Sequence, residues 1–508
     1  MTEDNNNIPV SPNIPVEPTQ PDAGQQENTQ EVTITTPVQS VSIEHQDIQK
    51  PTLRQRAEEF FREHKLLVIA GLVFIGLLLF LLLFLLVRKL LFPPKPKLVT
   101  LTYWGLWDSK EIMDPLIQEY QQLHPNIKIN YIQQDFAHRS EDYAYIGNYY
   151  AAVTERLSQT GGVDIMRVHH SWLPNIARFL TAAPAGLFDI QDIQNNYYKP
   201  ALQAMLWGEN VVSVPLQIDS VVMFYNPTLL EQAQVQTPPK DWEQVLQYAP
   251  KLTQKDGDRI TTAGIAIGTG SNVFHAPEIL LMLFTQSDVP ILDPQTRRFA
   301  LTTEEAAAAL KYYVNFHEQG VWSYKLPMDL SMFVNCRLAI LFAPSWRAIN
   351  FRASNPELDF AVAPPPVLPG ARPDVDQYIA NFYVEVVPKN SPNAKEAWEF
   401  LKWLSEPEQL QKLYANQRSV RGLDWPSPRK DVGESQDSYN PLAAIVHQMA
   451  PKTRTWFIYD WGLWEQVIRK LLITLESDPQ AGKRITPSTL APVEEELNNK
   501  IFLTNTNQ

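Results

Sequence analysis

The chain has 508 residues, a formal net charge of -13 and one cysteine. The excess of acidic residues disfavours a nucleic-acid partner, because such a partner requires a basic face. The single cysteine, Cys336, permits no internal disulfide, and no cysteine near the N-terminus is available for a lipid anchor.

Residues 1–50 are rich in Asn, Pro, Gln, Thr and Glu and contain few large apolar side chains. Such a segment cannot bury enough apolar surface to offset its chain entropy, so we expect a disordered tail. Residues 51–65 carry mixed charges around the pair Phe60-Phe61 and predict a short juxtamembrane helix.

Leu66 to Val87 form an unbroken apolar run without a charged residue. As a helix the run would span about 33 Å, enough for the hydrocarbon of a bilayer. A signal peptide would be shorter and would end in small residues, whereas Arg88-Lys89 and Pro93-Pro94 follow this run. A buried core helix is the structural alternative, but helices that are apolar on all sides are rare in soluble folds. We predict a single-pass transmembrane helix over 66–87.

The flanking charges set the expected orientation. Lysine and arginine residues lie on both sides of the run, with a slight excess on the N-terminal side. Because cytoplasmic flanks carry more positive charge, this excess weakly favours a cytoplasmic N-terminus and an extracytoplasmic domain. We therefore expect a protein of the cell membrane, attached through one helix.

A proline-broken spacer over 88–97 leads into a domain at 98–503, where strands alternate with helices. The pattern predicts strands at 98–103, 127–132 and 164–168 and helices at 111–123 and 146–158. This order indicates an α/β fold with an open sheet and a ligand site at the C-terminal ends of its strands. So long a domain exceeds a single core, so at least two lobes are expected.

Several segments of this domain resemble one known family. They are LTYWGLWDSKEIMDPLIQEYQQLHPNIKINY, VDIMRVHHSWLPNIARF, VPLQIDSVVMFYNPTLLEQAQVQTPPKDWEQVLQYAPKLTQKDG, FVNCRLAILFAPSWRAINF, FAVAPPPVLPG and VVPKNSPNAKEAWEFLKWLSEPEQ. In this order they resemble the sugar-type extracellular solute-binding proteins of ABC importers, the maltodextrin-binding-protein-like family. No single motif is specific, but their order over nearly the whole domain is.

The resemblance implies a two-lobed periplasmic-binding-protein-like fold with a hinge. It places the crossing segments near Pro215 to Val221 and near Ala380 to Val386. Lobe one would combine about 98–216 with 386–445, and lobe two about 220–382 with 450–503. Asn335-Cys336 stands where the family usually has a glycine, and the chain has only 19 glycines. We therefore expect bulkier cleft walls than usual.

The resemblance also implies where a ligand would be held. Sugars need flat aromatic faces for their C–H surface and carboxylates or amides for their hydroxyl groups. The residues expected at the cleft follow strand ends, lie in the crossing segments, or cluster before the last helices; they are Trp104, Trp107, His170, Trp172, Asp219, Trp346, Asn381, Tyr383, Tyr459, Trp461 and Trp464. For the aromatic residues, core packing is the alternative; for Asp219 it is a hinge carboxylate paired with a neighbouring donor.

We expect no cofactor and no metal ion. The adjacent His169 and His170 have no obvious third ligand nearby. The chain also has no G-x-x-x-x-G-K-[ST] phosphate loop. An importer's permease and ATPase would therefore be separate chains.

Three functions remain at this point. The first is capture of a small polar solute, a mono- or oligosaccharide, for an ABC importer. The second is a solute-sensing receptor without transport. The third is a carbohydrate-active enzyme with paired carboxylates; Asp108, Asp135 and Asp219 are candidate acids, but no spacing selects a pair. The sequence favours a protein that is not an enzyme.

Overall fold

Residues 52–91, 97–134, 144–159, 161–370, 372, 374–478 and 480–503 are described by the structure, a computed structural model. The predicted disordered tail over 1–50, most of the spacer's proline-rich part and Asp135 lie outside these residues. The chain divides into two units, Met1–Pro94 and Lys95–Gln508, which are considered separately.

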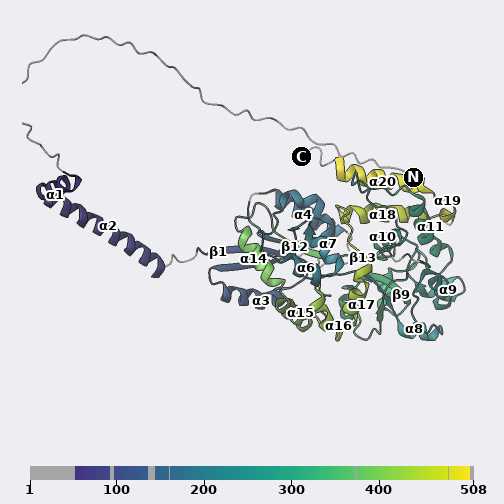
Figure 1. The fold of residues 1–508 in the computed structure, drawn as a ribbon. Coiled ribbons are helices and arrows are strands. Elements are labelled where there is room, and N and C mark those ends of the chain that lie inside the picture. The colour runs from purple at the N-terminus through teal and green to yellow at the C-terminus, as the bar shows by residue number, and fades with distance from the viewer. Residues whose placement is uncertain are drawn as a thin grey trace, which may run out of the picture. The chain divides into compact units, whose positions relative to one another are not determined.

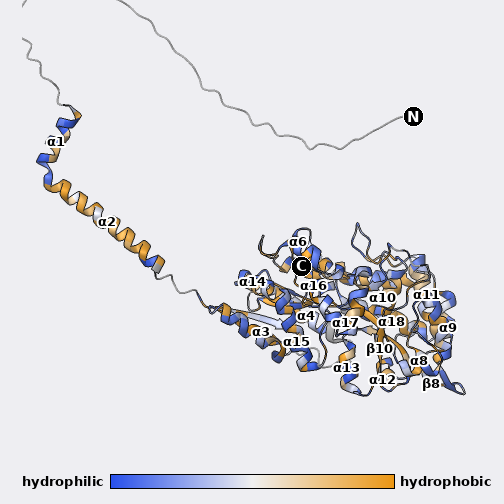
Figure 2. Ribbon diagram, turned by 60° about the horizontal axis from the view of Figure 1, so that its bottom comes forward, coloured by the Kyte–Doolittle hydropathy of each residue, from blue (hydrophilic) through white to orange (hydrophobic). Residues whose placement is uncertain are grey.

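The described part of the first unit holds two helices, α1 (Leu53–Glu63) and α2 (Lys65–Leu91). Helix α1 begins in a capping box, in which the Thr52 side chain accepts from the Gln55 backbone and the Gln55 side chain accepts from the Thr52 backbone. Figure 2 shows α2 as apolar along most of its length. Among the described residues, α2 is the one helix long and apolar enough to cross a membrane, and none of its apolar span is buried.

The second unit contains two larger sheets and two short ribbons (Figure 1). Its strands are β1 (Val99–Gly105), β2 (Ile127–Gln133), β3 (Ile165–His169), β4 (Leu206–Trp207), β5 (Asn210–Val211), β6 (Val221–Tyr225), β7 (Gln254–Asp256), β8 (Arg259–Ile265), β9 (Leu338–Pro344), β10 (Ala361–Ala363), β11 (Tyr378–Ile379), β12 (Tyr383–Val386) and β13 (Thr453–Arg454).

Helices surround these sheets (Figure 1). They are α3 (Lys110–Leu123), α4 (Ala144–Ser158), α5 (Leu173–Ile176), α6 (Ile190–Asn196), α7 (Lys199–Met205), α8 (Pro227–Gln232), α9 (Trp242–Leu252), α10 (Ala276–Gln286), α11 (Glu304–Glu318), α12 (Asp329–Val334), α13 (Arg347–Ser354), α14 (Ala394–Leu404), α15 (Pro407–Arg421), α16 (Lys430–Asp437), α17 (Pro441–Met449), α18 (Trp461–Glu476), α19 (Ala481–Arg484) and α20 (Pro487–Asn498), with shorter turns η1 (His170–Trp172), η2 (Ala177–Phe179), η3 (Ala450–Lys452) and η4 (Asn499–Leu503).

The predicted opening of the domain is confirmed. The strands expected at 98–103, 127–132 and 164–168 correspond to β1, β2 and β3, and the two expected helices to α3 and α4. Helix α3 buries the stripe of Ile112, Met113, Leu116, Ile117 and Tyr120, as its periodicity requires. The predicted and observed ends differ by at most two residues.

The first sheet has the order β12-β3-β1-β2, and the second has the order β10-β6-β9-β8-β7. In the first sheet, β1 pairs in parallel with β2 and β3, while β12 runs antiparallel to β3. In the second sheet, β8 and β9 are parallel, and β6 is antiparallel to both β9 and β10. The sheets are therefore built from segments that are far apart in the sequence.

Two crossing segments join the sheets and run antiparallel to each other. One leads from Val214 to β6 and the other from β11 to β12, and they are bridged at Val214–Glu385 and at Ser220–Ala380. The Asn381 N–H also donates to the Asp219 carbonyl at 3.0 Å. These are the segments in which the sequence placed the hinges, and they lie side by side between the two sheets.

A strained residue precedes β9. Cys336 has a φ of 55°, in the left-handed region that glycine adopts without steric cost. This is the place where the family that the sequence resembles usually has a glycine. The cysteine is exposed, so its side chain escapes a clash with the interior, but its backbone keeps the unfavourable conformation.

Candidate functional site

A cavity of about 50 Å³ lies where the two sheets meet the crossing segments. Its walls come from the loop after β1, both crossing segments, the start of α10, the loop after β9, the segment after α15, and α18. The lining residues are Trp107, Gln217, Asp219, Phe274, His275, Glu278, Pro344, Trp346, Arg347, Asn381, Phe382, Tyr383, Trp425 and Glu465. Ligand pockets commonly hold 300–1,000 Å³, so a solute of sugar size requires the walls to separate.

Aromatic rings from the two sides meet across this cavity. Trp107 follows β1, and Trp346 follows β9 of the second sheet; their rings stack with centroids 6.2 Å apart and an interplanar angle of 21°. The edge of Tyr383, from β12, meets Trp107 at 5.9 Å. Flat apolar faces of this kind are suited to the C–H surface of a sugar ring.

Asp219 joins the first crossing segment to the loop after β9. Its Oδ1 accepts from the backbone N–H of Ser220 at 2.7 Å and of Ser345 at 3.0 Å, and its Oδ2 accepts from the N–H of Trp346 at 3.2 Å. Burial raises the pKa of Asp219 to about 7, although these hydrogen bonds oppose the rise. The carboxyl group therefore anchors the loop that carries Trp346 and also lines the cavity.

The second-sheet side of the cavity carries a buried ionisable chain at the start of α10. The Arg347 Nε–H donates to His275 Nε2 at 3.1 Å, and His275 Nδ1 lies 2.8 Å from Glu278 Oε1. Because Arg347 can only donate, His275 Nε2 must be an acceptor, which places the proton on Nδ1 and leaves the ring neutral. Burial lowers the pKa of His275, in agreement with this assignment.

The pKa values of two carboxyl groups on this side are shifted in opposite directions. Burial would raise the pKa of Glu278, but His275 and Arg469 lower it overall. Burial and the charge of Glu278 together raise the pKa of Glu465 well above its ordinary value. Of the two, Glu465 is therefore the carboxyl group whose ionisation its surroundings oppose more strongly.

A second set of buried charges lies behind the first-sheet side of the cavity wall. Arg167 on β3 pairs with Asp108 at 2.7 Å and with Glu385 at 2.6 Å. Arg421 lies 3.3 Å from Asp108. Asp108 is the neighbour of Trp107, and Glu385 lies two residues after Tyr383, so this network orients two of the aromatic residues in the cavity wall.

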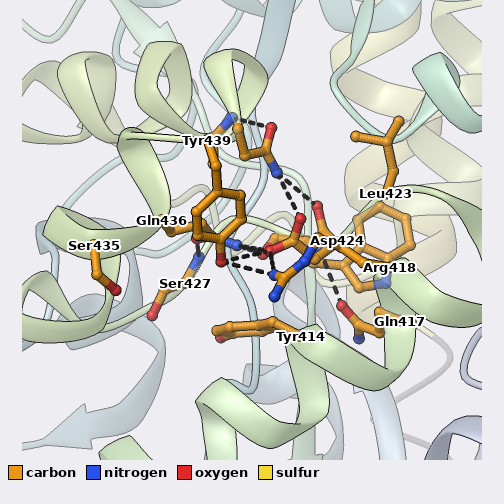
Figure 3. A network of polar contacts seen from close by, with 12 residues as sticks. Tyr414, Gln417, Arg418, Leu423, Asp424, Ser427, Ser435, Gln436 and Tyr439 are labelled. Atoms are coloured by element: carbon orange, nitrogen blue, oxygen red, sulfur yellow. Dashed lines mark hydrogen bonds and ion pairs between the residues drawn. The ribbon is translucent and has the colours of Figure 1, made fainter.

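The segment after α15 carries another polar network, drawn in Figure 3. The buried Asp424 carboxylate accepts from Arg418 at 2.8 Å, from Gln436 at 2.6 Å and from Asn440 at 3.0 Å. The next residue is Trp425, whose backbone N–H donates to Gln417 at 3.0 Å. These bonds fix an irregular segment so that the Trp425 ring forms part of the cavity wall.

Five of the residues that the sequence selected lie together in this cavity. They are Trp107, Asp219, Trp346, Asn381 and Tyr383. Asn381 Oδ1 also lies 3.1 Å from His169 Nε2, a contact that holds the second crossing segment against the end of β3.

Three selected aromatic residues of the first-sheet side do not line the cavity. Trp104 is half-buried within β1, with the Arg156 guanidinium 5.9 Å from its ring centroid. His170 is fully buried and stacks on Phe382 at 4.8 Å. Trp172 is fully buried against Tyr150. In each case core packing, the alternative considered from the sequence, describes the environment.

The three selected residues near α18 also lie elsewhere. Trp461 is buried against His169 at 5.3 Å, and Trp464 is buried and stacks on Phe299 at 6.1 Å. Tyr459 has a φ of 67° and lines a different, open groove of about 850 Å³. The α18 residue that does line the cavity is Glu465, which directly follows Trp464 and lies about one turn after Trp461.

The sequence did not indicate eight other polar or aromatic lining residues. They are Gln217, Phe274, His275, Glu278, Arg347, Phe382, Trp425 and Glu465. Arg347, Gln217 and Phe382 are next to or close to selected residues, so proximity along the chain was a usable signal for these three. The others come from helices and loops that only the tertiary fold brings to the cavity. Among the described residues, no group of three or more His, Cys, Asp or Glu side chains is arranged to hold a metal ion.

Comparison with known proteins gives a consistent result. The family profile described as bacterial extracellular solute-binding protein matches residues 107–411. A protein of Brucella abortus (strain 2308), described as a binding protein, is 22% identical over 275 residues, which cover 52% of this chain and 64% of that protein. The chain thus matches less than two thirds of the length of this curated relative.

Solved structures extend the likeness to nearly the whole second unit. The sugar-binding protein of the phytopathogen Xanthomonas citri is 18% identical, with a TM-score of 0.63 and coverage of 80% of this chain and 99% of that one. A cyclo/maltodextrin-binding protein complexed with maltotetraose is 16% identical, with a TM-score of 0.62 and coverage of 81% and 99%. The predicted two-lobed periplasmic-binding-protein-like fold is confirmed by these matches.

Proposed function

Since this chain belongs to the bacterial extracellular solute-binding protein family, we propose that it captures a small polar solute outside the cytoplasm and delivers it to an ABC importer. The solute is a mono- or oligosaccharide. The permease and the ATPase are separate chains, and α2 tethers the capture domain to the membrane beside them.

One observation carries this proposal: indole rings from opposite sides of the molecule meet over a buried carboxyl group. Trp107 and Trp346 come from different sheets, and Asp219 holds the Trp346 loop through two backbone hydrogen bonds. Separating the sheets would expose both indole faces, and a sugar ring between them would make contacts that exist only in the closed state. A ligand with such contacts favours closure by their free energy.

Tethering complements this capture cycle. The α2 helix keeps the domain near one membrane face, which raises its effective concentration at a permease in the same membrane. The proposed orientation has the N-terminal tail in the cytoplasm and the domain outside. Two crossing segments that join the lobes provide the hinge, and the lobes are those expected from the sequence, about 98–216 with 386–445 and about 220–382 with 450–503.

Calorimetric titration of the full chain in detergent with mono- and oligosaccharides tests the proposal. We expect saturable binding, and we expect Trp346→Ala to weaken it about tenfold or more, as for a truncated aromatic residue at a binding hot spot. Trp403→Ala is the matched control, because this half-buried tryptophan of α14 packs against Phe400 away from the cavity. Absence of binding to every sugar, or equal losses in both variants, would contradict the proposal.

The single cysteine gives a direct test of orientation. Cys336 is exposed and lies in the second unit. A membrane-impermeant maleimide should therefore label the protein in intact cells, whereas the Cys336→Ser variant should stay unlabelled. Labelling only after lysis would place the domain in the cytoplasm and overturn the proposed location.

A further inference from the structure

The second-sheet side of the cavity, together with the residues packed behind it, holds more buried carboxyl groups than guanidinium groups. Glu278, Asp329 and Glu465 are all at most 5% exposed, and each lies within the electrostatic influence of Arg469 or Arg347. His275 is neutral by its hydrogen bonds and adds no charge. Full ionisation of the three acids would therefore leave uncompensated negative charge in a dry interior, which is strongly unfavourable.

Burial disfavours the ionised form of two of these acids. Burial raises the pKa of Asp329 to about 7, against the opposing effect of hydrogen bonds from the Phe274 and Leu330 backbone. Burial and the neighbouring Glu278 raise the pKa of Glu465 well above its ordinary value. The side chain of Asp329 is occupied by two backbone donors, at 3.0 and 2.7 Å, whereas Glu465 lines the cavity.

The cavity also exposes hydrogen-bond acceptors that lack a donor. Among the described residues, Glu278 Oε2 and Gln217 Oε1 have no hydrogen-bond partner, although both side chains are more than nine-tenths buried and line the cavity. An unsatisfied buried acceptor costs about 1–3 kcal/mol, and more when it is charged. A ligand that brings N–H or O–H donors to these two oxygens would remove this cost.

The charges behind the other wall show that the excess is local. Arg167 and Arg421 face Asp108 and Glu385, so positive and negative charges are equal in number there. Nothing in that network requires a further cation. The demand for a further positive charge is therefore confined to the side formed by α10 and α18. Among the described residues, acceptors without a donor also occur outside it, at Gln217 Oε1 in the first crossing segment and at Glu385 Oε2 behind the aromatic wall.

We propose, resting on the function proposed above, that the solute is an amine-bearing saccharide whose ammonium group binds between Glu278 and Glu465. The ammonium group donates to Glu278 Oε2 and to the Glu465 carboxylate, and the sugar ring lies against the indole faces. Glu465 gives up its proton to solvent when the cation arrives, so binding exchanges one proton for one ammonium group. Asp219, Asp329, Arg347, Arg469 and neutral His275 are the other ionisable groups around this position.

Matched sugars test this inference on the unmodified full chain. Glucosamine is compared with glucose, and chitobiose, the disaccharide of glucosamine, with cellobiose, at a pH of about 6.5, where the amines are protonated. We expect the amine-bearing member of at least one pair to bind about tenfold or more tightly, as expected for a charge-assisted hydrogen bond. Titration in buffers of different ionisation enthalpy should show the release of about one proton with the amine alone.

The variant Glu465→Gln tests whether the preference for the amine and the proton release arise at this residue. Glutamine resembles the protonated acid, so the fold should be retained, while the preference for the amine and the proton release should both be lost. Glu495→Gln is the matched control, because Glu495 is an exposed carboxylate on α20, which packs on α18. It should leave both quantities unchanged.

The outcomes separate the two proposals. If glucose or cellobiose binds as well as its amine counterpart, or if Glu465→Gln keeps both the preference and the proton release, the amine inference is wrong and sugar capture stands. If none of the sugars, including those of the wider panel, binds, both proposals fail. Proton release is measured on the unmodified protein. Its absence would therefore contradict the inference even if the Glu465→Gln variant did not fold.

Discussion

The two sides of the cavity use buried charge differently. On the first-sheet side, Arg167 pairs with both Asp108 and Glu385, and these groups lie behind the aromatic wall rather than in it. On the second-sheet side, Glu278 and Glu465 reach the cavity itself, and Glu278 retains an oxygen without a donor.

This difference distinguishes a scaffold from a contact surface. A buried network with equal numbers of positive and negative charges does not require a further cation, so its effect on binding is indirect, through the rings that it orients. A buried network with excess acid and unsatisfied acceptors is stabilised by whatever supplies protons or donors. Substitutions on each side test whether the two networks differ in this way.

The largest effect is expected when the paired network is broken. Arg167→Met leaves Asp108 and Glu385 buried without their shared guanidinium, which should lower the free energy of unfolding by about 3–5 kcal/mol. Urea unfolding of the full chain in detergent measures this change. Glu465→Gln, on the other side, should cost little because it replaces a protonated acid by a neutral amide. If both substitutions lower the free energy of unfolding by the same amount, the two sides do not differ in their use of buried charge.

The pH dependence of stability should have opposite signs on the two sides. Asp329 has a folded pKa of about 7, above its ordinary value of 3.8, so the folded state binds more protons between these values. The stability of the wild type relative to Asp329→Asn should therefore fall as pH rises from about 4 to about 7, by at most about 1.4 kcal/mol per pH unit. Comparison with the variant cancels the contribution of the buried histidines to the pH dependence.

Asp108 provides the opposite case. Burial would raise its pKa, but Arg167 and Arg421 lower it below 3.8 overall. The stability of the wild type relative to Asp108→Asn should be fully present above a pH of about 4 and should be lost as pH falls through the depressed folded value. Unfolding curves of both variants at several pH values check the two signs, and equal signs would contradict the comparison.

The smallest effect concerns the backbone of the second-sheet side. Cys336 precedes the strand that carries the Trp346 loop and has a φ of 55°. Cys336→Gly should raise the free energy of unfolding by up to about 1 kcal/mol, since glycine removes the left-handed strain but adds chain entropy to the unfolded state. The urea midpoint measures it. Cys336→Ala should give no gain, and a gain equal to that of glycine would show that strain is not the cause.

Much of the fold could be predicted from the sequence. The predictions used two properties that can be read along the chain: the local periodicity of apolar residues and the order of the family-like segments. The alternation of strands and helices from Leu98 was confirmed by β1, α3, β2, α4 and β3. The order of the family-like segments predicted the two-lobed fold, which the solved structures confirm. The pairing of β12 with β3 was beyond local signals, because the two strands lie far apart in sequence.

The site could be predicted only in part. Trp107, Asp219 and Trp346 follow strand ends or crossing segments, where residues converge in open α/β folds, and the cavity brings them together. Glu278 and Glu465 lie within helices, where a carboxylate is ordinarily a solvated side chain, and no spacing links them. Near α18, the sequence selected the aromatic residues Tyr459, Trp461 and Trp464, whereas the side chain that lines the cavity is Glu465.

By itself, the sequence determined the long apolar helix, the α/β order and the family, because hydrophobic length, periodicity and motif order are properties of contiguous residues. Only the tertiary structure decided which aromatic residues line the cavity and which fill the core, and that the acids of α10, α12 and α18 share two guanidinium groups. The physical reason is that burial and charge balance depend on what lies around a side chain in space, and most of those neighbours are distant along the chain.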